Sequence, residues 1–231
     1  MSNFDLLDLS QKRVIHHVRQ SDIKRNCGAA CLCMLLRRYN LRGKMDEITD
    51  SISRPLPNGM PTCRNALIIK YMNSRGIPCC GVAALDIQGL VKKCFGLNID
   101  MIISYRTDPA KPFGHFSVVT GYDEEFIYVN DPSKNSADGS NLPIRFAELK
   151  EMMTVHPDGR EVVMDGTVIL LADPKADANT GIRAFNINGE PSDTLIFTDI
   201  ENDIGALIVL TQDDGIWVRK RQPNQPPPPA V

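Results

Sequence analysis

The sequence predicts an α+β fold, in which a helical half packs against an antiparallel sheet. Helical segments come first and strand-like segments follow them, an order that is typical of this class. The strand-like part also contains a hairpin, which alternates over residues 114–122, turns at 123–125 and returns over 126–132. With 231 residues, 42% of them apolar, the chain can bury a sizeable core, and we expect one main domain with an appendage.

Three segments before residue 75 have the pattern of helices. Asn26 suits an N-cap, and the helix that follows it to about Tyr39 is apolar nearly all round, so it is expected to be central. Residues 45–52 are expected to form a second, short helix. Residues 62–74 carry apolar side chains at helical spacing, and Gly76 is expected to end that third helix.

The next segments supply the strands. An apolar stretch near Val82, a helix over 86–95 and a strand-rich run over 100–106 lead to the hairpin. After the hairpin, residues 146–153 have a helical pattern. The apolar run 166–172 predicts a strand that closes the sheet.

Shifts in composition predict how the chain is divided. Residues 1–13 are expected to form a loose N-terminal arm and 14–173 the main domain. A polar, turn-rich linker over 174–181 then leads to 182–221, a small β appendage without cysteine or histidine. The proline-rich tail 222–231 is expected to be extended and mobile.

Charge and cysteine content exclude several classes of function. The formal net charge is −2 and both signs are spread along the chain, so neither nucleic acid nor an anionic membrane is an expected partner. No stretch is long enough to span a bilayer, and the N-terminus is too polar for a secretory signal. Seven cysteines, an odd number, suit a reducing compartment. We expect a cytoplasmic protein, with export by a route that uses no cleavable signal left open.

One cysteine and the two ends of the hairpin form a candidate catalytic group. Cys27 lies in the first turn of an apolar helix, where the partial positive charge of the helix favours a thiolate. Gly28 beside it allows another segment to approach closely. Because the hairpin strands are about equally long, His115 at the start of one should lie near Asp131 at the end of the other. Together they provide a nucleophile, a base and an orienting carboxylate, as acyl transfer requires.

These motifs resemble those of papain-like cysteine peptidases of the bacteriocin-processing, double-glycine-leader branch. The resemblance rests on Cys-Gly-Ala-Ala-Cys-Leu, Gly-His-Phe-Ser-Val-Val-Thr-Gly-Tyr and Asn-Asp-Pro, and its order and spacing extend over about residues 14–171. It implies a papain-like fold, with Cys27 as nucleophile, His115 as general base and Asp131 as the residue that orients the imidazole. It also implies a glutamine oxyanion donor before the cysteine. Gln20 is the candidate, although it stands seven positions before Cys27 where about six are expected.

The function implied is that of a thiol protease, a hydrolase that cleaves a peptide or isopeptide bond through a thioester, without a metal or organic cofactor. Its substrate would be a peptide or protein. An acyltransferase or a glutamine deamidase remains open, because each uses the same first half-reaction. A catalytically silent papain-like domain that binds a protein partner through its β appendage is the alternative from another class.

Several residues have structural interpretations that compete with catalytic ones. Cys31 and Cys33 are expected in the core, as is usual for cysteines in apolar helices. Asn-Asp-Pro is also ordinary turn chemistry, and Asn130 is an alternative orienting group. His16 and His17 are expected to face solvent. A zinc site built from them and the cysteines is disfavoured, because the adjacent Cys79 and Cys80 cannot easily both face one ion.

Overall fold

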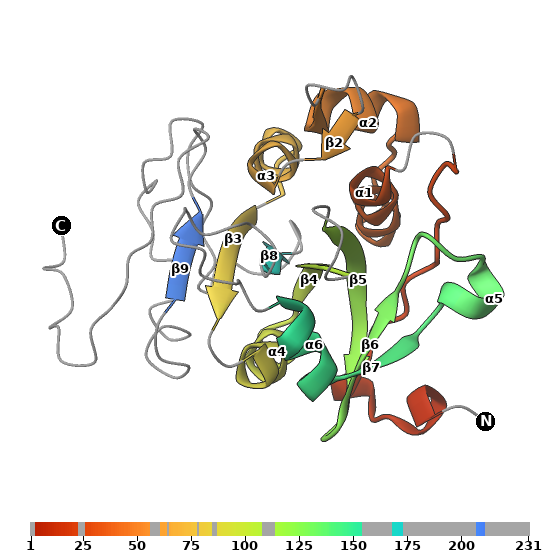
Figure 1. Cartoon of the computed structure of the whole chain (residues 1–231), viewed down its shortest axis with the longest axis vertical. Coiled ribbons are helices and arrows are strands. Elements are labelled where there is room, and N and C mark those ends of the chain that lie inside the picture. The colour runs from red at the N-terminus through yellow and green to blue at the C-terminus, as the bar shows by residue number, and fades with distance from the viewer. Residues whose placement is uncertain are drawn as a thin grey trace, which may run out of the picture.

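The computed structural model describes residues 3–22, 26–55, 61–63, 65–77, 79–84, 87–107, 114–153, 168–172 and 207–210. Within these residues, seven strands form an antiparallel sheet in the order β7-β6-β5-β4-β8-β3-β9 (Figure 1). The strands are β3 (Cys79–Ala84), β4 (Ile99–Tyr105), β5 (His115–Tyr122), β6 (Phe126–Asn130), β7 (Leu142–Arg145), β8 (Val168–Ala172) and β9 (Leu207–Leu210). The short strands β1 (Ser53–Pro55) and β2 (Pro61–Cys63) pair separately.

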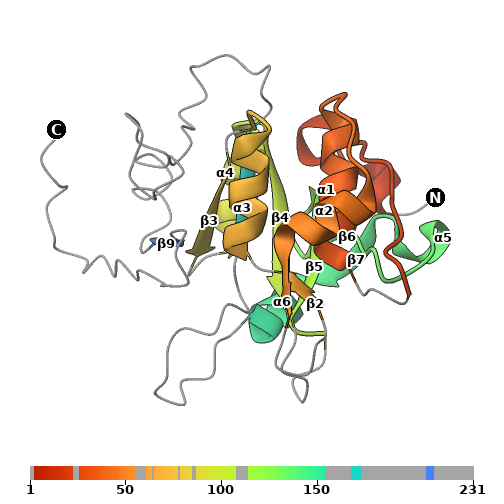
Figure 2. The same cartoon turned by 90° about the horizontal axis from the view of Figure 1, so that it is seen from above.

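Helices cover both faces of the sheet (Figures 1 and 2). One face packs against α1 (Cys27–Arg38), α2 (Met45–Ile52) and α3 (Asn65–Ser74), and the other against α4 (Ile87–Gly96) and α6 (Phe146–Met153). The alternation of strand side chains explains this division: Ile102 of β4 belongs to the first core cluster, whereas Ile103 belongs to the second. The predicted α+β class, with helices packed on an antiparallel sheet, is confirmed.

Helix α1 is central, as its apolar sequence predicts. Every residue from Cys27 to Leu36 is buried. Asn26 occupies the N-cap position, as predicted, but its side chain makes no hydrogen bond to the helix N-terminus. Its carboxamide instead accepts a hydrogen bond from the Ser21 N–H and donates one to Thr49 Oγ1, at 2.8 and 2.9 Å. Asn26 therefore ties the segment before the helix to α2.

The third helix begins later than predicted. Thr62 and Cys63 lie in β2, which pairs with β1, so α3 starts at Asn65. Strand pairing with a segment ten residues away decides the structure here, and helical periodicity alone does not reveal it. The predicted end is confirmed: Gly76 has a φ of +74°, a backbone conformation that glycine adopts without strain.

Strand β8 does not close the sheet as expected, but lies inside it between β4 and β3. Both faces of the strand are buried, with Ile169 and Leu171 in one core cluster and Val168 and Leu170 in the other. A strand that is apolar on both faces is typical of a sheet interior. The far edge is instead β9, which pairs with β3 (Figure 1).

The prediction of a loose N-terminal arm is wrong for residues 3–13. Two short 3₁₀ helices, η1 (Asn3–Leu6) and η2 (Leu9–Gln11), lie against the sheet. Phe4 is buried with its ring edge against Tyr128, at a centroid distance of 5.5 Å. The Arg13 N–H donates to the Thr120 carbonyl at 2.6 Å. The arm thus packs along β5 and directs the segment that follows.

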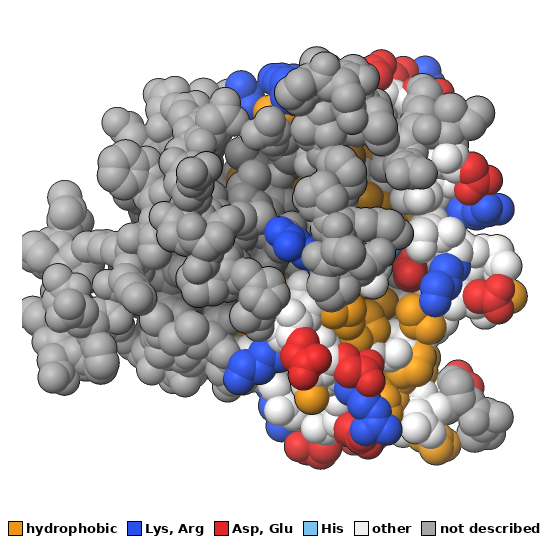
Figure 3. All heavy atoms as spheres, viewed as in Figure 1, with side chains coloured by type: hydrophobic (Ala, Val, Ile, Leu, Met, Phe, Trp, Pro, Cys, Tyr) orange, Lys and Arg blue, Asp and Glu red, His pale blue; other side chains and the backbone are white. Residues whose placement is uncertain are grey.

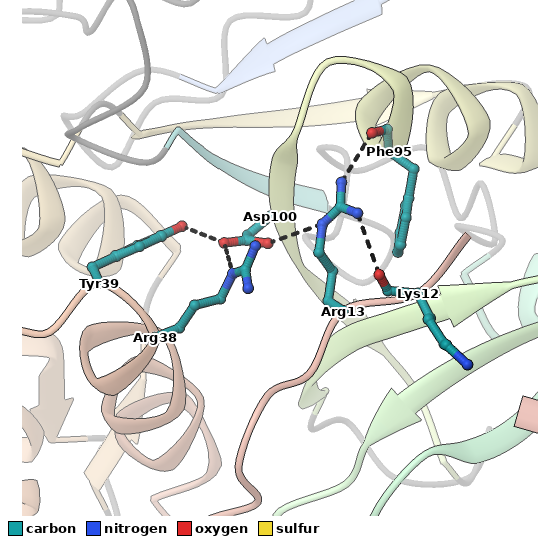
Figure 4. Close-up of polar contacts among 6 residues, drawn as sticks. All are labelled: Lys12, Arg13, Arg38, Tyr39, Phe95 and Asp100. Atoms are coloured by element: carbon teal, nitrogen blue, oxygen red, sulfur yellow. Dashed lines mark hydrogen bonds and ion pairs between the residues drawn. The ribbon is translucent and has the colours of Figure 1, made fainter. Parts of the chain in front are cut away.

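A buried carboxylate joins the arm to α1 and β4 (Figure 4). Asp100 is 2% exposed, and its Oδ2 accepts hydrogen bonds from Arg38 Nε and the Tyr39 hydroxyl, both at 2.8 Å. Arg13 Nε forms an ion pair with Asp100 Oδ1 at 3.8 Å. The Arg13 guanidinium also donates to the Phe95 carbonyl at 2.9 Å and lies over the Phe95 ring. Burial lowers the pKa of Arg13 and raises that of Tyr39.

The surface and the C-terminal region give less information about function. On the face in Figure 3, acidic and basic side chains of the described residues lie interspersed. Within the described ranges, no helix has the length and apolar character needed to cross a bilayer. Strand β9 falls inside residues 182–221, the predicted β appendage. The linker 174–181, the rest of the appendage and the tail 222–231 lie outside the described residues, so the domain boundaries remain predictions.

Candidate active site

Cys27 is the first residue of α1 and is 8% exposed. The preceding Asn26 is anchored on both sides by Ser21 and Thr49, so the turn that leads into the helix is fixed. Gly28 permits a close approach, as predicted: a Cβ there would lie 3.2 Å from both the Cβ and Sγ atoms of Cys63. The start of the helix is therefore packed closely around Cys27.

His115 is the first residue of β5, and strand pairing fixes its position. It lies opposite Tyr105 of β4, whose ring meets the imidazole edge-to-face at a centroid distance of 5.7 Å. Its Nε2 lies 2.7 Å from Oδ1 of Asp131. The Cys27 side chain lies close enough to His115 to raise the pKa of the imidazole. Since Nε2 faces Asp131, Nδ1 is the ring nitrogen left for the thiol.

Asp131 directly follows β6 and is 4% exposed. Its Oδ1 accepts three hydrogen bonds: from His115 Nε2 at 2.7 Å, from the Ser133 N–H at 2.9 Å and from the Ser133 hydroxyl at 2.7 Å. Burial alone would raise the pKa of this carboxyl, but the hydrogen bonds and the charge of His115 outweigh burial and lower it. Asp131 is therefore ionised at neutral pH.

The same contacts set the charge of His115. Burial lowers the pKa of the imidazole, but hydrogen bonds to Asp131 and Cys27, with the charges of both, outweigh burial and raise it to about 9. The raised pKa makes the imidazole a stronger base. A cysteine, an imidazole that can take and return its proton, and a carboxylate that holds the imidazole can together generate and reprotonate a thiolate nucleophile.

Ser133 is a site residue that sequence reasoning missed. A signal was present, because a hydroxyl residue two positions after an aspartate often closes a local turn onto the carboxylate. Asn130 was wrongly considered as a substitute orienting group. Its Nδ2 donates to the Ile15 carbonyl at 2.8 Å and its Oδ1 accepts from the Asn141 N–H at 3.0 Å, so both polar atoms of the amide are engaged elsewhere.

Gln20 lies beside the turn that carries Asp131. Its backbone N–H donates to the Pro132 carbonyl at 2.8 Å. The side-chain Oε1 is buried and has no hydrogen-bond partner among the described residues. An unpaired buried amide atom carries a free-energy cost unless another molecule satisfies it. One atom of the Gln20 amide therefore remains available to a partner that this part of the chain does not supply.

The other described cysteines differ from Cys27 in their surroundings. Cys31 and Cys33 are buried in the core, as predicted. Burial raises the pKa of five other thiols, those of Cys31, Cys33, Cys63, Cys79 and Cys94. The pKa of Cys63 rises to about 11. These five cysteines are therefore protonated at neutral pH. Among the residues that the structure describes, no cluster of histidine, cysteine and carboxylate side chains has the arrangement of a metal site.

The two neighbouring histidines of the N-terminal segment have different environments. His16 is exposed, as predicted. The expectation that His17 faces solvent is wrong, because it is half-buried and its Nε2 lies 2.8 Å from the Asp131 carbonyl oxygen. The reason is that residues 15–20 run alongside the Asp131 turn, a neighbour that sequence periodicity does not identify.

Solved structures that resemble this chain are peptidase domains. The peptidase domain of Streptococcus ComA, a bi-functional ABC transporter involved in a quorum-sensing pathway, matches with 17% identity over 68% of this chain and 96% of its own, with a TM-score of 0.51. A double-glycine-motif protease from an AMS/PCAT transporter, in complex with the leader peptide, matches with 18% identity over 70% and 93%, with a TM-score of 0.48. At these identities the likeness concerns the fold.

The family assignment comes from the sequence profile. No curated protein sequence matches the chain. The profile of the Peptidase C39 family matches residues 14–141, more than half of the chain and the part that contains Cys27, His115 and Asp131. The resemblance that the sequence motifs indicate is thereby confirmed. The chain belongs to the Peptidase C39 family and is a papain-like cysteine peptidase.

Proposed function

We propose that this peptidase hydrolyses a peptide or isopeptide bond through a Cys27–His115–Asp131 triad and a thioester intermediate. The observation that supports the triad best is the 2.7 Å hydrogen bond between His115 Nε2 and Asp131 Oδ1, on an imidazole whose pKa the nearby Cys27 side chain also raises. The family assignment supports the reaction class. Neither the contacts of His115 nor the family assignment depends on the identity of the substrate.

In the first half-reaction, Nδ1 of His115 takes the Cys27 proton and the thiolate attacks the carbonyl carbon. When the tetrahedral intermediate collapses, the C–N bond breaks, the imidazolium gives its proton to the leaving amine, and a thioester remains on Cys27. His115 then takes a proton from water, whose hydroxide attacks the thioester. The acid product leaves and the proton returns to the thiol. Asp131 keeps Nε2 protonated and stabilises the imidazolium throughout.

The oxyanion requires donors near Cys27. The backbone N–H of Cys27 lies at the start of α1, where the first amides of a helix have no partner within the helix. The amide of Gln20, through its Nε2, is the proposed second donor, because the backbone of Gln20 is held beside the Asp131 turn by its hydrogen bond to the Pro132 carbonyl. Loss of one such donor typically lowers the rate by about 10²- to 10³-fold.

The proposed substrate is a peptide or protein, since one of the similar structures is described in complex with a leader peptide. We keep the cytoplasmic location and the absence of nucleic-acid and membrane partners as parts of this proposal. Recognition of a protein partner by residues 182–221 is a further part of it. The net charge, the cysteine content and the composition of the sequence support these features.

The product of the reaction tests the function. Wild-type protein and Cys27→Ala are incubated with a peptide library in water labelled with heavy oxygen, and the products are analysed by mass spectrometry. Hydrolysis yields a cleaved peptide with label in its new carboxylate, absent with Cys27→Ala. A cleaved peptide that carries an added amine and no label would favour acyl transfer. Conversion of glutamine to labelled glutamate without cleavage would favour deamidation.

Replacing Asp131 by alanine is expected to lower kcat/KM less than replacing His115. The carboxylate orients and stabilises a base that retains its own chemistry, so the difference should be about 10²-fold. Asn130 cannot compensate, because its amide is engaged with Ile15 and Asn141. Steady-state kinetics on both variants, with circular dichroism as the check of folding, measure the difference. Equal losses in folded proteins would contradict the role of Asp131.

Activity is expected to fall as pH rises through about 9, the pKa of His115. The sign follows from the raised pKa: the imidazolium that protonates the leaving amine persists below this value and is lost above it. In Asp131→Asn the alkaline limb should move downward by about one to three pH units, because the stabilising charge is gone. Profiles of kcat/KM against pH measure both. A wild-type limb near the ordinary histidine pKa of about 6.5 would contradict the prediction.

A further inference from the structure

We propose that His17 is a positioning residue of this peptidase, which fixes the segment that carries Gln20 to the turn that carries Asp131. The inference rests on the proposed triad. His17 contacts no reacting atom and acts through the backbone of Asp131. Its evidence is a set of hydrogen bonds between residues far apart in the sequence.

Both ring nitrogens of His17 are engaged on the Asp131 turn. Nε2 lies 2.8 Å from the Asp131 carbonyl oxygen, and because a carbonyl only accepts, Nε2 is the donor. Nδ1 lies 3.2 Å from the Ser136 hydroxyl, which donates to it in the neutral ring. Ser136 begins the short helix α5 (Ser136–Gly139), which follows the turn. One neutral tautomer of His17 therefore satisfies both contacts and joins the turn to α5.

The contact belongs to a ladder that aligns the two segments. The Ile15 carbonyl accepts from Asn130 Nδ2 at 2.8 Å, and the Gln20 N–H donates to the Pro132 carbonyl at 2.8 Å. His17 lies between these two contacts and bonds to Asp131, which lies between Asn130 and Pro132. The backbone positions of Gln20 and Asp131 are thus coupled, and His17 supplies the side chain at the middle of the coupling.

The peptide groups of Asp131 are bonded on both sides. Its N–H donates to the Gly139 carbonyl at 2.8 Å, while its carbonyl accepts from His17. Gly139 leaves no room for a side chain here, since a Cβ would lie 2.6 Å from the Asp131 carbonyl oxygen and 2.8 Å from His17 Nε2. With the backbone fixed in this way, the Asp131 carboxylate is directed at His115.

The expected function of His17 follows from the sensitivity of catalysis to geometry. A displacement of about 1 Å from a change outside the reacting atoms can lower a rate by about 10²-fold. Side chains that hold a catalytic group by hydrogen bonds limit such displacements. Loss of His17 should therefore weaken the contact of Asp131 with His115 without removing either residue.

The test compares His17→Ala and His17→Gln with His16→Ala, a matched control at the exposed neighbouring position. The first readout is the titration midpoint of His115 by imidazole NMR, which is practicable because the chain has only four histidines. The second is the rate at which iodoacetamide alkylates Cys27 at neutral pH, measured by mass spectrometry. Neither readout needs the natural substrate.

In His17→Ala we expect the His115 midpoint to fall by about one pH unit and the alkylation of Cys27 to slow by about tenfold. His17→Gln should recover most of both values, because its amide N–H can donate to the same carbonyl. His16→Ala should match the wild type. A folded His17→Ala protein with wild-type titration and alkylation would overturn the inference, as would equal losses in His16→Ala.

Two further variants keep the result decisive. If His17→Ala does not fold, Gly139→Ala places a Cβ 2.6 Å from the Asp131 carbonyl oxygen and 2.8 Å from His17 Nε2, so this contact must shift with both side chains present, and both readouts should change in the same direction. Unchanged values would overturn the inference. Asp131→Asn separates this inference from the proposed triad: a lowered His115 midpoint in Asp131→Asn but not in His17→Ala rejects His17 alone. An unchanged midpoint in Asp131→Asn rejects the triad itself.

Discussion

Replacing Cys27 by alanine is expected to abolish turnover, with a loss on the order of 10⁴- to 10⁶-fold in kcat, while the protein stays folded. The sulfur atom forms the thioester, and alanine offers no nucleophile at that point. Alanine is also the best helix former, and Cys27 occupies the first turn of α1, so the substitution keeps the apolar face of the helix. Peptide cleavage and the thermal unfolding midpoint, measured on one preparation, test both parts.

Cys31 offers the matched control for this substitution. It lies one turn further along α1 and is fully buried, and burial raises the pKa of its thiol. Cys31→Ala should keep wild-type kcat and lose about 1 kcal/mol of unfolding free energy, because the change removes buried packing and no chemistry. An active Cys27→Ala protein together with a folded but inactive Cys31→Ala protein would contradict the assignment of the nucleophile.

Local patterns in the sequence predicted the elements that carry the triad. Helix α1 follows from its apolar run and α2 from its pattern over Met45–Ile52, and the structure bears out both. The hairpin of β5 and β6 follows from alternation around a short polar turn, and it brings His115 within hydrogen-bond distance of Asp131. In these cases the interactions that decide the structure lie within a few residues or across one turn. The periodicity of apolar residues in the sequence reflects interactions over this short distance.

Features that depend on distant segments escaped the same reasoning. The interior place of β8 depends on pairing with β4 and β3, which lie well before it in the sequence. Asn26 looks like a helix cap, yet its amide bonds Thr49, 23 positions away. His17 resembles a surface histidine, yet its partner Asp131 is 114 positions away. Periodicity reports which face of an element is apolar but not which segment covers that face, so such contacts need the folded structure.

Replacing Asp100 by asparagine is expected to lower the free energy of unfolding by about 3–5 kcal/mol, which is the usual cost of removing one partner of a buried ion pair. The carboxylate is 1% exposed and faces Arg13, whose side chain is 9% exposed. It also accepts hydrogen bonds from Arg38 and Tyr39. Asparagine keeps the shape but leaves the Arg13 guanidinium buried without a counter-charge. Urea denaturation of the variant and the wild type measures the loss as a lower midpoint at unchanged slope.

The exposed pair Lys44–Glu47 provides the control, because its side chains are 82% and 68% exposed. Glu47→Ala should leave the urea midpoint close to that of the wild type, since solvent screens the charges of surface pairs. Arg38 and Tyr39 lie at the C-terminal end of α1 and Cys27 at its start, so Asp100→Asn should retain kcat at temperatures where it stays folded. A similar small loss in both variants would contradict the prediction. A large loss confined to Asp100→Asn would show that this carboxylate stabilises the packing of the N-terminal arm, α1 and β4 on one another.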